Sequence, residues 1–117
     1  MSGDVGPGDP GSRLSAMHNE TVQRIEELGR SFDDIVEAAS DVATDDEHDP
    51  EGHTIAWERQ QIAALLGDAR SALAAIEAAL SRLDEGTYGT CSTCGRRIEA
   101  ARLEALPATP HCLRCAR

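Results

Sequence analysis

Four cysteines near the C-terminus constrain the fold of this chain more than any other feature. They form two CxxC pairs, Cys91/Cys94 and Cys112/Cys115, with seventeen residues between the pairs. This spacing is typical of a tetrahedral zinc site, because each CxxC turn directs two sulfurs at one ion and a loop of about 15–20 residues lets the second pair close the shell. Since four protein ligands leave no position for water or substrate, we predict one structural Zn²⁺ ion.

Two disulfides or four free thiols are the alternatives to a metal. Residues 1–11 have neither the basic start nor the apolar core of a secretory signal. No stretch reaches the roughly 20 apolar residues of a membrane span. We therefore expect a cytoplasmic protein without a membrane partner, in a reducing compartment where paired CxxC motifs favour metal over disulfide. His111 adjoins Cys112, but with four well-spaced sulfurs we expect it to be a surface neighbour of the site.

The charge of the chain is strongly negative and unevenly placed. The formal net charge is −10, and every basic side chain except histidine is arginine. Such a chain is repelled by phosphate backbones, which argues against nucleic acid as the main partner. No arginine lies between Arg30 and Arg59, whereas residues 86–117 carry five arginines against two glutamates.

Apolar residues recur at intervals of three and four in two segments, a pattern typical of coiled-coil helices. The first stripe comprises Ile25, Leu28, Phe32, Ile35, Ala39 and Val42. The second comprises Ile55, Ile62, Leu66, Ala69, Leu73, Ile76, Leu80 and Leu83. Aromatic residues are only 3% of the chain, so thin helix-on-helix packing is expected rather than a thick core.

A short polar break between the stripes makes the two helices antiparallel neighbours. Pro50 cannot lie inside a helix without losing a backbone bond, and Gly86 marks the end of the second helix. We therefore predict an all-α chain with three parts. They are a disordered tail at 1–13, an antiparallel coiled-coil hairpin at 14–85 with an acidic tip at 44–52, and a four-cysteine zinc finger at 86–117.

The acidic tip is the second candidate functional feature. Asp45, Asp46 and Asp49 contribute nothing to helix packing there, so a role in function is favoured over a merely solvated loop. A calcium-binding EF-hand is excluded, because the sixth position counted from Asp45 is Pro50 and not glycine. Trp57 lies off the stripe; we expect it to cover the base of the loop, the alternative being an anchor for a partner.

The segment from Tyr88 to Cys115 resembles the DksA/TraR family of C4-type zinc fingers. The order of parts, a helical hairpin with an acidic tip followed by the finger, resembles that family as well. Because the chain ends at Arg117, it is most similar to short TraR-like or actinobacterial-type members. Besides the four cysteines, the similarity includes Tyr88, Gly89, Gly95, Ile98, Arg102, Leu103, Glu104, Ala105 and Pro107.

The resemblance implies a transcription regulator that binds bacterial RNA polymerase directly and makes no contact with promoter DNA. It implies that the coiled coil enters the secondary channel with its acidic tip, here Asp45, Asp46 and Asp49, near the catalytic centre. The family's D-x-x-D-x-A motif has Glu51 at its last position in this chain. The resemblance also suggests Arg102 as a contact to the channel rim.

Dependence on the alarmone ppGpp receives little support, since the chain has no lysine and has Leu106 before the proline of the finger. We expect a monomer. The main alternative function is a zinc-stapled helical module that binds another protein or self-associates without acting on RNA polymerase. A nucleic-acid-binding zinc ribbon is disfavoured by the charge, and no nucleophile–base pair or open metal position indicates an enzyme.

Overall fold

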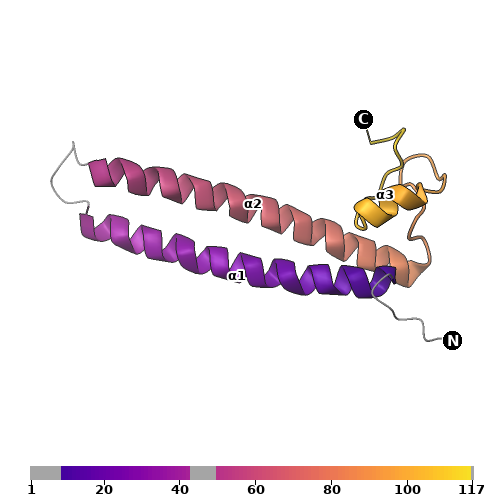
Figure 1. Ribbon diagram of the computed structural model, residues 1–117, viewed down its shortest axis with the longest axis horizontal. Coiled ribbons are helices and arrows are strands. Elements are labelled where there is room, and N and C mark those ends of the chain that lie inside the picture. Colours follow the sequence, from indigo (N-terminus) through magenta and orange to yellow (C-terminus); the bar gives the residue numbers. More distant parts are fainter. Residues whose placement is uncertain (1–8, 43–49, 117) are drawn as a thin grey trace. The chain divides into compact units, whose positions relative to one another are not determined.

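The computed structural model describes residues 9–42 and 50–116 (Figure 1). These residues contain three helices: α1 (Pro10–Val42), α2 (Pro50–Glu85) and the short α3 (Ala100–Ala105). The described residues contain no strand, only an isolated bridge between Thr90 and Arg97. The prediction of an all-α chain is confirmed. Asp45, Asp46 and Asp49 lie outside the described residues.

The chain divides into two compact units. We call residues 21–71 the hairpin unit, and the described part of 1–20 together with 72–116 the base unit. The predicted domains placed the boundary at residue 86, between helix and finger, and that division stays a prediction. In the part of the chain that the structure describes, no helix is long and apolar enough to cross a membrane.

Helix α1 begins four residues before the expected start at residue 14. The side chain of Asp9 caps it, since the backbone N–H of Ser12 donates to Asp9 Oδ2 at 3.0 Å. Pro10 occupies the first helical position, where its missing N–H is not needed and its fixed φ suits the helix. The glycine- and proline-rich composition suggested a tail up to residue 13, but the Asp–Pro cap starts the helix within it.

In the hairpin unit, the first part of α2 runs antiparallel to the second part of α1 (Figure 1). Among the predicted stripe residues of this unit, Leu66 and Ala69 are buried. The other stripe residues whose burial is described are half-buried, namely Ile25, Leu28, Phe32, Ile35, Ile55 and Ile62. Two helices cover only one side of each stripe, so the core is thin, as the low aromatic content predicted. Trp57 is 61% exposed on α2.

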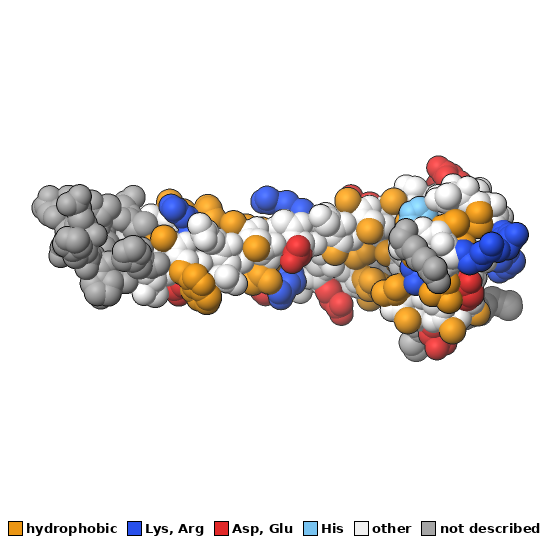
Figure 2. Space-filling model, turned by 90° about the horizontal axis from the view of Figure 1, so that it is seen from above, with side chains coloured by type: hydrophobic (Ala, Val, Ile, Leu, Met, Phe, Trp, Pro, Cys, Tyr) orange, Lys and Arg blue, Asp and Glu red, His pale blue; other side chains and the backbone are white. Residues whose placement is uncertain are grey.

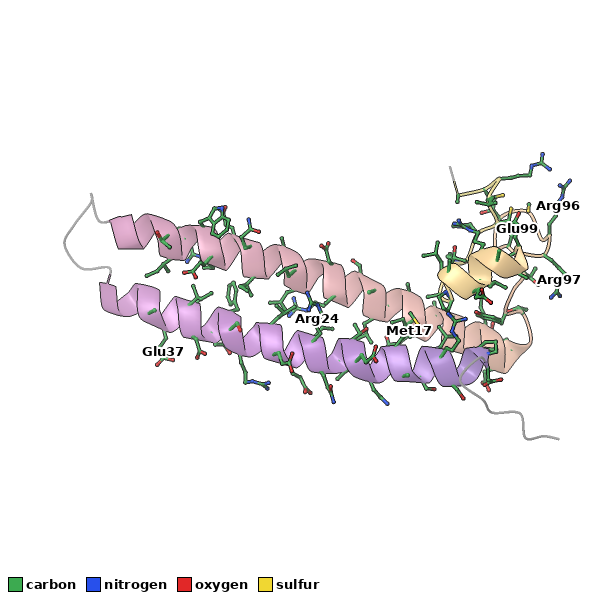
Figure 3. The ribbon with its side chains drawn as sticks, in the orientation of Figure 1. Met17, Arg24, Glu37, Arg96, Arg97 and Glu99 are labelled. Atoms are coloured by element: carbon green, nitrogen blue, oxygen red, sulfur yellow. The ribbon has the colours of Figure 1, made fainter. Side chains whose placement is uncertain are left out.

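The base unit has a denser apolar cluster. Leu14 and Ala79 are fully buried, and Ile76 lies with them. Met17 of α1 points toward α2 in Figure 3 and packs on this cluster, as do four partly buried residues, Leu80, Leu83, Tyr88 and Ala108. The cluster therefore joins the first turns of α1, the last turns of α2 and the start of the finger.

Two side chains from the helices and one from the start of the finger hold a short segment of the finger, residues 104–108. Arg13 Nη2 donates to the carbonyl of Glu104 at 2.6 Å. The Tyr88 hydroxyl donates to the carbonyl of Pro107 at 2.7 Å. Arg82 Nη2 lies 3.4 Å from the carbonyl of Ala108, to which it donates. Because helix ends and finger share these bonds and one apolar cluster, they fold as one unit.

Candidate metal centre

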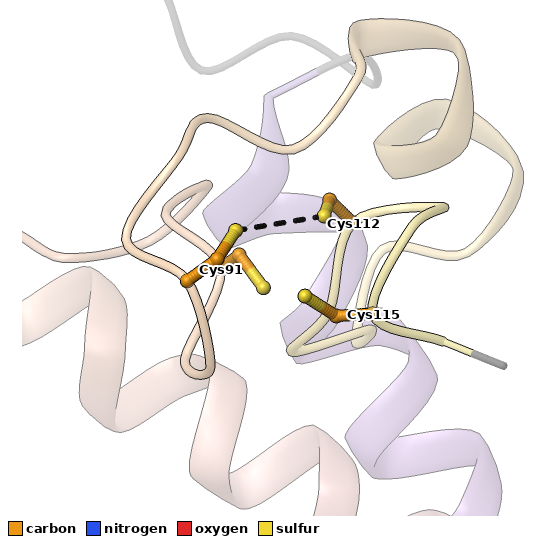
Figure 4. A group of neighbouring side chains, drawn as sticks. Cys91, Cys112 and Cys115 are labelled. Atoms are coloured by element: carbon orange, nitrogen blue, oxygen red, sulfur yellow. Dashed lines mark hydrogen bonds between the residues drawn. The ribbon is translucent and has the colours of Figure 1, made fainter.

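The four predicted zinc ligands lie together. The sulfur atoms of Cys91, Cys94, Cys112 and Cys115 are all within 4.8 Å of one another, and Figure 4 shows the labelled thiols directed at a common centre. Cys94 Sγ and Cys112 Sγ are 3.8 Å apart. A tetrahedral ion with Zn–S bonds of about 2.3 Å separates its sulfurs by about 3.8 Å. A disulfide needs about 2.05 Å, and all four cysteines are free.

Each pair of cysteines is presented by a tight turn. In the first, the N–H of Gly95 donates to the carbonyl of Cys91 at 3.0 Å, and the positive φ of Gly95, +77°, is a backbone conformation that side chains disfavour. In the second, the N–H of Cys115 donates to the carbonyl of Cys112 at 3.1 Å. The N–H of Ser92 bonds the carbonyl of Pro110 at 2.8 Å, which ties the two turns together.

The finger has little apolar core of its own. Its buried apolar cluster comprises Cys91, Cys112 and Ile98, and Leu103 of α3 packs on them. A cluster in which two of three residues are metal ligands cannot stabilise a segment of this size by apolar burial alone. The metal is therefore the main source of folding free energy in the finger, as in other structural zinc sites.

The electrostatics of the cluster favour a bound cation. Backbone amides of Cys112 and Cys94 lower the pKa of Cys91 to about 5, so this thiol readily becomes a thiolate. Partial burial and the three neighbouring thiols raise the pKa of Cys115 to about 12. Four sulfurs this close cannot all ionise without a compensating charge, and a divalent ion supplies it while its binding releases the remaining protons.

Arg102, the predicted rim contact, has an internal role. It is half-buried on α3, where Nε donates to the carbonyl of His111 at 2.8 Å and Nη2 reaches Thr109 Oγ1 at 3.4 Å. These bonds hold the loop that leads into Cys112. A contact from Arg102 to another molecule stays a prediction. His111 is not one of the four clustered ligands; its Nδ1 lies 3.3 Å from Thr93 Oγ1.

Glu99 stabilises the turn that carries the second cysteine pair, Cys112 and Cys115. Its Oε1 accepts the backbone N–H of Leu113 at 3.2 Å. The hydrogen bond from its own backbone amide, together with this one from Leu113, lowers the pKa of the Glu99 carboxyl. Glu99 and Arg102 thus fix residues 109–113 between them. Sequence patterns could not reveal this, because both side chains bond to backbone atoms of a loop.

The exposed cationic groups of the finger are other arginines. Arg96, Arg97 and Arg114 are exposed, and in the described part of the chain none of their guanidinium groups makes an ion pair or hydrogen bond. Arg96 and Arg97 extend away from the finger in Figure 3, and Figure 2 shows basic side chains grouped on the base unit. Arg96 and Arg114 line a shallow hollow of about 370 Å³ together with Cys94 and Cys115.

Comparison with known proteins confirms the resemblance seen in the sequence. Residues 86–117 match the prokaryotic dksA/traR C4-type zinc finger family. The RNA polymerase-binding transcription factor DksA of Haemophilus influenzae is 41% identical over 46 residues, which cover 39% of this chain and 32% of that protein. The uncharacterized protein YteA of Bacillus subtilis is 40% identical over 62 residues, 53% of this chain and 26% of that one. The chain thus spans a third or less of these relatives.

A solved structure shares the fold. The transcription factor DksA2 from Pseudomonas aeruginosa superposes with a TM-score of 0.53 over 90% of this chain and 81% of its own. The two sequences are 24% identical, so the likeness concerns the fold alone. Together with the four clustered cysteines, the family match establishes that the finger binds one structural zinc ion.

Proposed function

Because residues 86–117 match the prokaryotic dksA/traR C4-type zinc finger family, we propose that the chain binds bacterial RNA polymerase directly and regulates transcription. The observation that supports this most is the 41% identity to an RNA polymerase-binding transcription factor, over 46 residues. The likeness of fold to a second transcription factor extends over 90% of the chain. We place this activity in the cytoplasm, and we propose that it involves no direct contact with promoter DNA and no dependence on ppGpp.

The hairpin unit is the part proposed to enter the secondary channel of the polymerase. Two paired helices, each about 10–12 Å across with side chains, form a narrow element, and residues 21–42 rise about 33 Å along their axis. This unit carries thirteen carboxylates against four arginines, a net charge of −9. The predicted tip residues Asp45, Asp46 and Asp49 would place carboxylates near the magnesium-bearing catalytic centre.

The finger is proposed to stabilise the base of this element. We assign its zinc ligands to Cys91, Cys94, Cys112 and Cys115, which fit a tetrahedral site in distance and in charge. When bound, the ion neutralises thiolate charge and cross-links two turns, with no position free for chemistry. Through the bonds to residues 104–108, a folded finger also fixes the ends of α1 and α2.

Binding to RNA polymerase tests the proposal directly. Zinc-loaded protein should co-purify with the polymerase core enzyme and change the lifetime of open promoter complexes. The variant Asp45→Asn/Asp46→Asn/Asp49→Asn should still bind but lose that effect. A control, Glu26→Gln/Glu27→Gln/Asp68→Asn, removes three exposed charges from the same unit and should behave as the parent.

Two outcomes contradict different parts of the proposal. If the parent protein does not bind the polymerase, the function itself is wrong. If the triple aspartate variant keeps the full effect on open complexes, the tip does not act as proposed, although the polymerase remains the partner.

The alternative of a zinc-stapled interaction module rests on one observation. Trp57, Val36 and Leu65 are exposed apolar side chains of the hairpin unit, and Trp57 is 61% exposed. Exposed tryptophan is typical of protein-binding anchors. Under this alternative, Trp57→Ala abolishes binding to another partner, and no variant affects transcription by purified polymerase.

A further inference from the structure

One face of α1 combines carboxylates with an exposed apolar side chain. Val36 and Glu37 follow Asp33 by three and four residues, so all three lie on one side of the helix. All three are exposed, and Glu37 points away from α2 in Figure 3. Like charges at this spacing destabilise a helix slightly, and neither carboxylate has an ion-pair partner among the described residues. We call these three residues the acidic face.

The finger presents the complementary combination. Arg96 and Arg114 border the same hollow, and neither pairs with a carboxylate in the described structure. Leu113, next to Arg114, is 56% exposed. We call Arg96, Leu113 and Arg114 the basic face. Guanidinium groups beside an apolar side chain are typical of protein–protein interfaces.

We propose that the basic face of one copy of this chain binds the acidic face of a second copy. Each face offers two charges of one sign and one exposed apolar residue, so two ion pairs and one apolar contact, between Leu113 and Val36, satisfy both. The occupant is a second copy because the chain itself supplies the matching surface. The charge difference between the units also favours contact between the hairpin unit of one copy and the finger of another. The net charge is −9 on the hairpin unit and −1 on residues 1–20 and 72–117.

Repulsion between two chains of net charge −10 opposes this contact. At physiological salt, however, charges farther apart than about 8 Å are largely screened, so ion pairs formed in contact outweigh the distant repulsion. The zinc–thiolate centre itself adds about −2, which means that the outward arginines, and not the overall charge of the finger, carry the attraction. A nucleic acid is a less suitable partner for the basic face. Its phosphates gain nothing from contact with the apolar Leu113 side chain, and the negative charge of the hairpin unit repels them.

The proposed association is weak. Exposed ion pairs contribute little each, so we expect a dissociation constant on the order of 0.1 mM. The expected monomer is then the main species at low concentration. A contact between two different faces is heterologous and can repeat from copy to copy, so the average mass should rise gradually with concentration.

Sedimentation of the zinc-loaded full chain at physiological salt tests the proposal. Arg96→Glu/Arg114→Glu and Asp33→Arg/Glu37→Arg should each weaken association about tenfold or more. The variant carrying all four reversals restores the complementarity and should regain the parent's association. The controls Arg59→Glu/Arg70→Glu and Glu26→Arg/Glu58→Arg make the same charge changes at exposed sites outside both faces and should associate as the parent does.

Three results overturn the proposal: a parent protein that stays monomeric up to about 1 mM, an association that survives both double reversals, or a fourfold variant that does not recover. All variants are first checked for one bound zinc and unchanged helix content. No polymerase is present in these measurements, so their failure leaves the proposed function standing, and failure to bind polymerase leaves this proposal standing.

Discussion

The base unit and the hairpin unit are stabilised in different ways. In the base unit, specific hydrogen bonds join side chains to backbone carbonyls, and the unit contains both a buried cluster around Leu14 and Ala79 and a metal site. In the hairpin unit, the described core is one row of apolar residues, of which only Leu66 and Ala69 are buried. The charges differ as well. The base unit contains eight carboxylates and seven arginines, and the hairpin unit contains thirteen carboxylates and four arginines.

The difference shows which unit is free to change. A helix pair held by a repeating stripe tolerates substitution on its outer surface, because no exposed residue there is needed for the fold. A unit held by individual bonds to backbone atoms does not. The hairpin unit can therefore carry a large unbalanced charge that would destabilise a compact core, while the base unit keeps its geometry.

Removing zinc should have the largest effect and should separate the two units most clearly. Zinc binding contributes about 10–16 kcal/mol in isolated zinc-finger peptides, so chelation is expected to unfold residues 86–116. Hydrogen exchange with mass spectrometry should show unprotected finger amides but little change in residues 54–71. Cys112→Ser should do the same, and added zinc should reverse the effect of chelation only. A finger that stays protected without metal would contradict the physical account.

Truncating one core leucine in each unit compares the two kinds of packing. Leu→Ala substitutions cost about 2–5 kcal/mol, depending on how far the site can collapse. Leu14 is fully buried, whereas Leu66 is 7% exposed in a core only one row deep. We expect about 3–4 kcal/mol for Leu14→Ala and about 2 kcal/mol for Leu66→Ala, measured by denaturant unfolding with zinc present. Equal losses would show that the two cores are equally dense.

Replacing Tyr88 tests a single bond of the base unit. Tyr88→Phe removes the hydroxyl that donates to the Pro107 carbonyl, and we expect a loss of about 1 kcal/mol at neutral pH. Ser81→Ala, which removes an exposed hydroxyl from the same unit, serves as the control.

The same substitution has a pH signature. Burial raises the pKa of Tyr88, so the folded chain keeps this proton when the unfolded chain has begun to lose it. The stabilisation is therefore complete below pH about 10 and is lost as the pH rises above it. Tyr88 is the only tyrosine and the chain has no lysine, so Tyr88→Phe should flatten the alkaline decline seen in thermal unfolding. An unchanged decline would exclude Tyr88 as its source.

The smallest effect is expected where a polar contact of the base unit is exposed. His18 Nε2 and Glu77 Oε2 are 3.3 Å apart, with 32% and 58% of their side chains exposed. Water and salt screen such a pair, so Glu77→Gln should cost less than about 0.5 kcal/mol. A larger loss in chemical unfolding would mean that bonds at the surface of this unit matter as much as those to the 104–108 segment.

Periodic features were predictable from sequence because they repeat. The stripe through Leu66, Ala69 and Ile76 is buried as expected, and the cysteine spacing predicted the sulfur cluster correctly. Ala79 was missed, since a small residue beside the stripe at Leu80 carries no periodic signal, although it is fully buried. The start of α1 was misplaced because a single Asp–Pro cap outweighs the composition around it.

Single long-range contacts were not predictable. The sequence did not indicate that the guanidinium of Arg102 bonds the carbonyl of His111, nine residues further along the chain. Nothing in the pattern of the sequence identifies which backbone carbonyl a given arginine will reach. The aspartates of the predicted tip lie outside the described residues, so their role depends on the transcription experiment.

The exposed Trp57 gives the protein a built-in optical reporter. It is the only tryptophan of the chain and belongs to the hairpin unit, while the base unit absorbs near-ultraviolet light mainly through Tyr88. An indole that is 61% exposed emits from a largely aqueous environment, and any partner that covers it shifts that emission toward shorter wavelength. Selective excitation of tryptophan therefore reports binding at the hairpin unit without an added label, because the finger contains no tryptophan.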